Sequence, residues 1–81
     1  MINALPARYS STVQLQLIVG GVAFGLSQIG PSHIVLDKPQ DLPPGDAEVV
    51  MYIDGHPRTW LVRLLHGAVP YDRTVEIEDR I

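Results

Sequence analysis

The sequence lacks cysteine and has few basic residues. Without cysteine, the chain of 81 residues has no disulfide framework, no thiol nucleophile and no cysteine-ligated zinc. The chain has six Lys and Arg residues, spread along its length, and nine Asp and Glu residues, so its net charge is −3. Because nucleic-acid binders concentrate positive charge on one face, this composition argues against a nucleic-acid partner. Small secreted domains usually need disulfides, so we expect a cytoplasmic protein.

A long hydrophobic run is also missing. Residues 9–36 contain no charged side chain, but glutamines and serines interrupt them, and only residues 17–26 are continuously non-polar. A membrane-spanning helix needs about 20 mostly apolar residues, so we expect no contact with a membrane. Residues 1–8 also lack the basic start and the apolar stretch of a signal peptide.

What the sequence does contain is a pair of alternating segments around two glycines. Residues 13–19 and 22–27 alternate apolar and polar side chains, and Gly20-Gly21 lies between them. Glycine accepts the positive φ values of tight turns, so we predict a two-residue hairpin whose flanking valines pair. This register places most apolar residues on one face: Val13, Leu15, Leu17, Val19, Val22, Phe24 and Leu26. Ile18 is the one large apolar residue on the other face.

A second hairpin is predicted around Asp54-Gly55, another dipeptide that favours two-residue turns. Its strands are residues 47–53 and 58–64. The register predicts a core face made of Val49, Met51, Ile53, Trp60, Val62 and Leu64. The same register sets Asp46 opposite Arg63, where the two can form a cross-strand ion pair.

Two shorter segments, residues 33–37 and 73–78, also alternate and are predicted to be strands. Their inward side chains are expected to be Ile34, Leu36, Val75 and Ile77. Residues 38–46 hold three of the seven prolines, and proline donates no backbone hydrogen bond. This stretch is therefore predicted to be a loop, from which Leu42 can still reach the core.

Together these segments predict one all-β domain over residues 1–81. Two domains would each be too small to bury a core, and no segment shows helical periodicity of useful length. Six short strands at nearly even spacing predict a small antiparallel barrel or a two-sheet sandwich, with about six strands in meander order. Residues 1–9 and 79–81 are expected to be flexible.

The second hairpin has more apolar residues on its outer face than contact with water requires. With one residue of the first hairpin, they form a candidate interface: Ile18, Val50, Tyr52 and Leu61. Monomers rarely expose large contiguous apolar patches. We therefore expect either a loop, Leu42 or residues 69–71, or a second copy of the chain to cover this surface, and we favour a homodimer with C2 symmetry.

Residues that could carry chemistry are present but do not form a motif. His33, His56 and His66 each lie near an aspartate, yet none has the close spacing of a dedicated metal-ligand motif. No serine lies in a nucleophile elbow, and the glycines lack the Lys-Ser/Thr of a phosphate loop. We therefore predict a protein that is not an enzyme, with no catalytic residue, cofactor or metal site.

Two segments, QIGPSHIVL at 28–36 and DLPPGDAEVVM at 41–51, resemble the order of strands, turn and loop in a PilZ domain. The resemblance spans residues 13–64 and implies a small β-barrel. At the three polar and glycine positions of the family's turn motif, this chain has Gln28, Gly30 and His33. The paired arginines that bind cyclic di-GMP phosphates are reduced to Arg8. The resemblance thus implies the barrel without the residues for that nucleotide.

These observations favour a non-enzymatic binding module that acts through protein contacts, with a second copy of the chain as one partner. The alternative is a degenerate PilZ-type sensor of a small ligand or nucleotide. A small hydrolase or metal protein is the least favoured hypothesis.

Overall fold

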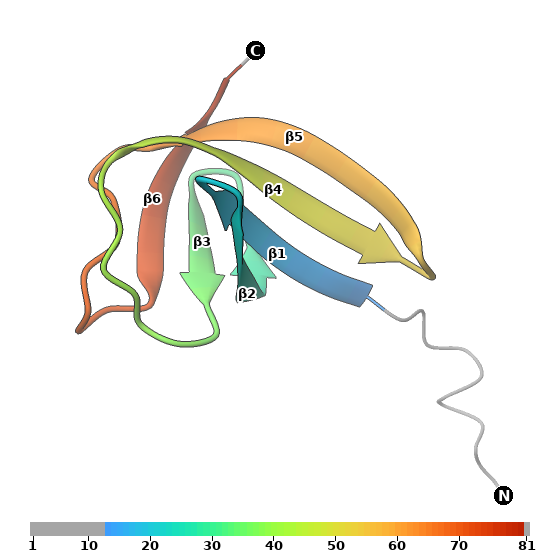
Figure 1. The fold of residues 1–81 in the computed structure, drawn as a ribbon, viewed down its shortest axis with the longest axis horizontal. Helices are drawn as coiled ribbons and strands as arrows, with labels where there is room; N and C mark the ends of the chain where they lie inside the picture. The colour runs from blue at the N-terminus through green and yellow to red at the C-terminus, as the bar shows by residue number, and fades with distance from the viewer. Residues whose placement is uncertain (1–12, 81) are drawn as a thin grey trace, which may run out of the picture.

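The structure is a computed structural model that describes residues 13–80. These residues form six strands and no helix: β1 (Val13–Val19), β2 (Val22–Ile29), β3 (His33–Leu36), β4 (Gly45–Ile53), β5 (His56–Leu64) and β6 (Thr74–Asp79). All neighbouring strands are antiparallel, and they close into a barrel in the order β1-β2-β3-β6-β5-β4 (Figure 1). The predicted all-β fold is confirmed, and it is the barrel that forms.

Both predicted two-residue hairpins are present. Val19 pairs with Val22, and Ile53 pairs with His56, so each register is the expected one. The two residues of the Gly20-Gly21 turn have φ values of 58° and 82°, a region that residues with a side chain resist. The turn therefore requires these glycines and sets the pairing of the first two strands.

The strand order differs from a simple meander at one connection. In a meander β4 would pair with β3. Here the chain crosses the barrel after β3, so β4 pairs with β1 on the side away from β2, and β6 pairs with β3. The connection is the proline-rich residues 37–44, which cannot form a tight hairpin because proline lacks an N–H donor. Instead it passes over one end of the barrel, where Leu42 exchanges two backbone hydrogen bonds of 2.9 and 2.8 Å with Ala68.

The core lies inside the barrel and uses many of the side chains that alternation predicted. Val22, predicted on the apolar face of the first hairpin, is instead 54% exposed because it lies beside the turn. The buried members of the core are Leu17, Leu26, Ile34, Leu36, Ala47, Val49, Val62, Leu64, Ala68, Val75 and Ile77. Leu42 packs against this cluster from the loop, and Trp60 packs against it while remaining partly exposed. Asp46 lies opposite Arg63 as expected, with 3.7 Å between Oδ1 and Nε.

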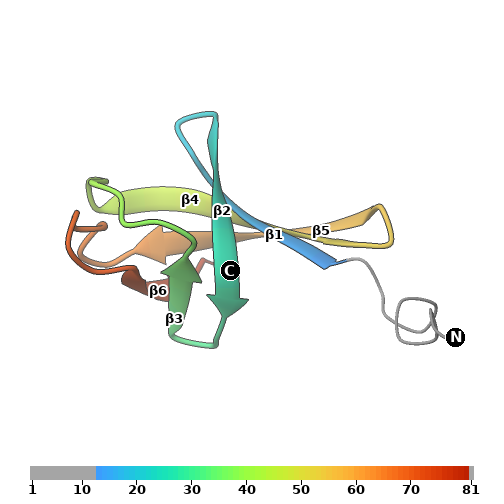
Figure 2. The ribbon, with the colours of Figure 1, turned by 90° about the horizontal axis from the view of Figure 1, so that it is seen from below.

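Three strands, β1, β4 and β5, extend beyond the region where the barrel closes. β2 pairs only with residues 16–19 of β1, and β6 pairs only with residues 62–64 of β5. The remaining three-stranded extension points away from β3 and β6 (Figures 1 and 2). We call it the arm and define it as residues 13–15 of β1, 50–53 of β4 and 56–60 of β5.

The arm corrects part of the predicted core. Met51 and Ile53 share the inward face of Val49, but they are only partly buried because neither β2 nor β6 extends far enough to cover them. Val50, predicted to lie on an apolar outer surface, is only 8% exposed. It lies on the central strand β4 between Gln16 and Thr59, whose side chains flank it on the same face.

The structure describes the chain almost to its last residue but begins only at residue 13. Residues 1–9 and Ile81, predicted to be flexible, lie outside the described residues. Asp79 ends β6, and the Arg80 N–H donates to the Leu61 carbonyl at 3.0 Å.

Candidate functional site

The inner face of the arm presents apolar side chains beyond the closed barrel. Cross-strand pairing sets Leu15 beside Met51, and Val13 beside Ile53, on the face that elsewhere forms the core. Val13 is 49% exposed, and the other three are partly buried. Trp60 lies at the base of the same face, on which β5 also places Arg58 beside Met51 and His56 beside Ile53. Contiguous apolar side chains of this kind are typical of an interaction surface.

The arm also has a strand edge that no described residue pairs with. The Gly20-Gly21 hairpin makes Val19 and Val22 a hydrogen-bonded pair, and backbone groups alternate between the two sides of a strand. The N–H and C=O groups of Val13 and Leu15 therefore point to the side of β2. Gln16 and Gly25 are a non-hydrogen-bonded pair, which the Leu15 carbonyl and the Leu26 N–H join, so the groups beyond the pairing are the Leu15 N–H and both groups of Val13. Among residues 13–80, this stretch of β1 has β4 on one side and no strand on the other.

A bulge explains why β2 leaves β1. Leu26 pairs with Leu36, and Gln28 pairs with Val35, so Ser27 is an extra residue in β2. A bulge bends its strand and increases the local twist, and here it coincides with the point where β1 and β2 separate. Between them lies an open groove of about 660 Å³, which we call the edge groove; its lining consists of Val13, Gln14, Leu15, Gln16, Gly25, Leu26, Ser27 and Asp37.

The carboxylate of Asp37 lies in this groove. Two hydrogen bonds hold the residue there, and the absence of a side chain at residue 25 leaves room for it. The Asp37 N–H donates to the Gly25 carbonyl at 3.0 Å, and the Ser27 hydroxyl donates to Asp37 Oδ1 at 2.5 Å. The other carboxylate oxygen lies where a Cβ on residue 25 would be, so any side chain there would collide with it. Asp37 is solvent-exposed, and no Lys or Arg of residues 13–80 forms an ion pair with it. The edge groove therefore has a negative wall.

The opposite edge of the arm is different. The hairpin register directs the backbone groups of Pro57 and Thr59 away from β4, towards the outer edge of β5. Pro57 has no N–H to offer, and Arg58 adds a charge beside it. Proline and charge on an edge strand discourage pairing with another chain. Of the two edges of the arm, the β1 edge is thus the one open to an added strand.

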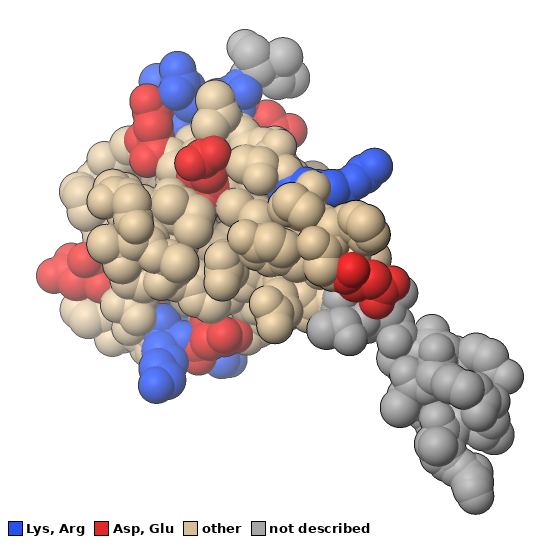
Figure 3. Space-filling model, turned by 45° about the vertical axis from the view of Figure 1, so that its right-hand side comes forward, with Lys and Arg blue, Asp and Glu red and all other residues tan. Residues whose placement is uncertain are grey.

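Charge on the surface is scattered. On the face shown in Figure 3, Lys and Arg side chains lie around the rim, interspersed with Asp and Glu, and the centre is uncharged. Arg63 and Arg80 both contact the Asp46 carboxylate, at 3.7 and 2.9 Å. The described residues on the face shown in Figure 3 therefore form no continuous positive surface.

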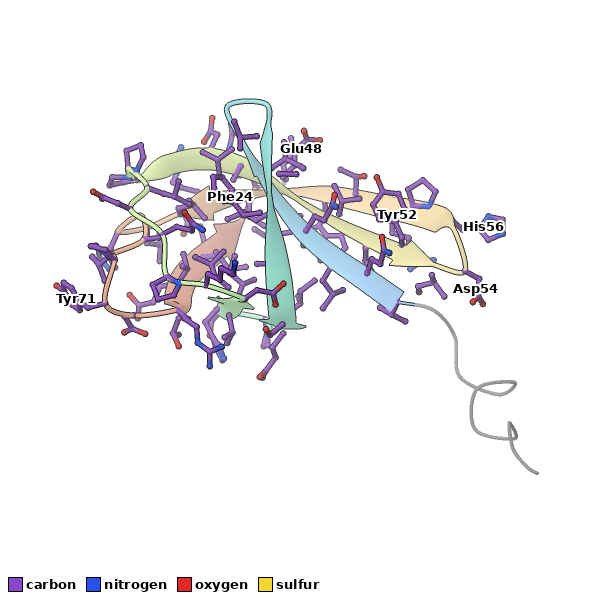
Figure 4. All side chains as sticks on the ribbon, turned by 60° about the horizontal axis from the view of Figure 1, so that its bottom comes forward. Phe24, Glu48, Tyr52, Asp54, His56 and Tyr71 are labelled. Carbon is purple, nitrogen blue, oxygen red and sulfur yellow. The ribbon has the colours of Figure 1, made fainter. Side chains whose placement is uncertain are left out.

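The structure separates the residues of the candidate interface. Tyr52 lies on the outer face of the arm (Figure 4), one row from buried Val50. Leu61 is 49% exposed and pairs with Glu48, and Ile18 pairs with Glu48 from the other side. A carboxylate thus lies between the two apolar side chains. Leu42 packs into the core, so it does not cover this surface.

The histidines are far from forming a common site. His33 begins β3, and His56 lies at the tip of the arm beside Asp54, at the other end of the molecule from Tyr71 (Figure 4). His66 Nε2 lies 3.0 Å from Glu76 Oε1 on the surface. Within residues 13–80, no three His, Asp or Glu side chains gather closely enough to hold a metal ion.

The turn that resembles a PilZ motif connects β2 and β3. Its Gly30 N–H donates to the His33 carbonyl at 2.8 Å, which closes the turn. Arg8, the only arginine near the expected phosphate-binding position, lies outside the described residues. The PilZ resemblance remains a prediction.

Sequence reasoning did not find the edge groove. The sequence places Gly25 within the alternating segment 22–27 and Asp37 at the end of segment 33–37. Neither residue signals the groove by itself, because the groove depends on where β2 bends away from β1. The alternation that ends at Ser27 is the only local signal of that bend.

Comparisons of the chain with protein-family models, with curated proteins and with solved structures find no match. The described part of the chain has no helix that is long and apolar enough to cross a membrane. A small barrel by itself serves many functions, so the arm and the edge groove are the features that point to the function of this one.

Proposed function

We propose that this protein is a non-catalytic binding module that acts through protein contacts, and that the arm makes those contacts. The observation that carries the proposal is the combination, on one element, of an apolar inner face and an unpaired strand edge. Either feature alone is common, but together they offer a partner both apolar burial and backbone hydrogen bonds.

The barrel supports this role by holding the arm rigidly. β4 and β5 pair over their whole length of nine residues each, from the barrel to the tip of the arm. The side chains at the base of the arm, Leu17 and Val49, are fully buried. A binding surface on a rigid strand loses less conformational entropy on association than one on a loop.

Affinity capture with matched variants tests the proposal. Proteins retained from the source cell by the native chain should be lost with Ile53→Lys, which places a charge on the inner face of the arm. They should be retained with Leu61→Lys, which places the same charge on the outer surface of the barrel. The strongest retained protein is then purified and its binding to the three chains is measured by calorimetry.

Circular dichroism must first show that both variants fold. If Ile53→Lys and Leu61→Lys lose binding equally, or if neither loses it, the arm is not the contact surface. If purified proteins bind none of the chains, the proposal of a protein-binding module fails.

The alternative function, a degenerate PilZ-type ligand sensor, is tested by titration with cyclic di-GMP. Paired arginines provide the bidentate contacts that its phosphates need, and this chain offers only Arg8 near the expected position. We expect no appreciable heat of binding. Micromolar binding would support the sensor instead of the protein-binding module.

A further inference from the structure

We propose that the edge groove binds an extended segment of a partner protein, which adds to β1 as a strand and alternates apolar with basic side chains. This inference rests on the proposed function and specifies the chemistry of the partner. Three observations support it: the backbone groups of Val13 and the Leu15 N–H, which lie beyond the pairing with β2, the two-sided lining of the groove, and the carboxylate on its wall.

The backbone groups determine the conformation of the segment. Val13 directs its N–H and C=O groups, and Leu15 its N–H group, into the groove at the spacing of a β ladder. Only an extended strand matches that spacing, because a helix satisfies its own backbone groups. The added strand would occupy the position that β2 would have taken had it not bent away at Ser27.

The lining determines the alternation of side chains. Leu15 and Leu26 lie on the inner, apolar side of the groove, while Gln14 and Gln16 lie on the outer side. Successive residues of a strand point to opposite faces. An added strand therefore directs every second side chain towards the leucines and the intervening side chains towards the glutamines and Asp37.

The carboxylate determines the charge of the outer side chains. Asp37 is held by Ser27 and by the Gly25 carbonyl through its own N–H, so its position is set before a ligand arrives. A lysine or arginine on the outer side of the added strand would lie against it, whereas a glutamate would be repelled. The groove thus favours apolar-basic alternation over apolar-acidic alternation.

The probe for this inference is the synthetic peptide acetyl-Val-Lys-Val-Lys-Val-amide, titrated into the full chain and followed by ¹H–¹⁵N spectra and amide exchange. We expect shifts confined to the lining of the groove and slower exchange of the Leu15 amide. The matched peptide with glutamate in place of lysine should bind more weakly. Asp37→Asn should weaken binding of the lysine peptide about three- to fivefold, and the control Asp41→Asn, which removes the same charge elsewhere, should not.

Backbone pairing has its own control. Two further peptides carry N-methyl groups either on the valines or on the lysines, and only one set of N–H groups can face β1. One peptide should lose binding and the other should keep it. If both behave alike, the segment does not add as a strand.

The outcomes separate this inference from the proposed function. If Ile53→Lys abolishes capture of a partner but the lysine peptide does not bind, strand addition is wrong and the binding module stands. A Leu15 amide that is already protected without peptide would show that residues 1–12 or a second copy occupies the edge, and sedimentation distinguishes these two cases. Either result overturns the inference.

Discussion

The barrel and the arm share three strands, β1, β4 and β5, and the same alternation, yet they differ in burial. Leu17 and Leu15 lie two residues apart on one face of β1; Leu17 is 0% exposed, whereas Leu15 is partly exposed. The difference is that β2 pairs with residues 16–19 of the strand and not with residues 13–15. Apolar alternation therefore defines which face a residue occupies, and the neighbouring strands decide whether that face is buried.

This division separates stability from binding. The barrel contains nearly all fully buried side chains, including those contributed by β3 and β6. The arm adds little burial of its own, so substitutions on it are tolerated and its surface can serve a partner. A small domain that must conserve its core gains from placing its binding surface outside that core.

The largest expected effect comes from the two leucines of β1. Leu17→Ala leaves a cavity in the closed core and should lower the free energy of unfolding by about 2–5 kcal/mol. Leu15→Ala removes a side chain that is already partly in water and should cost about 1 kcal/mol. Urea denaturation of both variants gives the comparison, and equal losses would show that the arm is part of one continuous core.

Two glycines at turns provide a second comparison. Gly67, at the closed end of the barrel, and Gly55, at the tip of the arm, have φ values of 69° and 82°. A Cβ at residue 67 would collide with the backbone of Leu42 and Pro43, whereas a Cβ at residue 55 would meet no atom within 4 Å.

Gly67→Ala should therefore cost about 2–4 kcal/mol, from strain in φ together with overpacking against a backbone that cannot rotate away. Gly55→Ala should cost about 1–2 kcal/mol, from φ alone. Thermal unfolding measures both. A cost at residue 55 as large as that at residue 67 would mean that the tip of the arm is as constrained as the barrel.

The elements predicted from sequence are those whose signals are local. Gly20-Gly21 and Asp54-Gly55 specify their turns, and the turns specify the registers of both hairpins. Alternation then identifies inward residues such as Ile34 and Val75, both of which are buried. Each of these predictions depends on residues within one strand or one turn.

What could not be predicted depends on pairing between distant segments. The crossing from β3 to β4 and the place of β6 beside β3 depend on loop geometry across the barrel. Exposure of Met51 and Ile53 depends on how far β2 and β6 extend, and the edge groove depends on the Ser27 bulge. A short strand such as β3, with only four residues, carries too little pattern to identify its neighbours.

A smaller effect is expected where charges join the strands at the barrel end. Asp46 contacts Arg63 of the adjacent strand and Arg80 just after β6. All three side chains are about half exposed, so Asp46→Asn should cost no more than about 1 kcal/mol, and less at high salt. Urea denaturation at low and high salt checks both points. A larger, salt-independent loss would show that these contacts help to close the barrel.

The smallest effect on folding, and a separate test of the outer surface, is expected for Leu61→Asp. Leu61 is half exposed, so in the monomer the change should alter the free energy of unfolding by only about 0.5 kcal/mol. It lies with Ile18 and the Gly20-Gly21 turn around a shallow hollow of about 230 Å³, a surface that a second copy could fill by C2 symmetry.

We expect sedimentation equilibrium to show a weak dimer of the native chain at high concentration. We expect Leu61→Asp to be monomeric, because it places a charge on the surface where two copies would meet, next to Glu48. Leu15→Asp, which changes only the arm, should dimerise like the native chain. If Leu15→Asp is the variant that becomes monomeric, the copies pair through their arms and the barrel surface is not an interface.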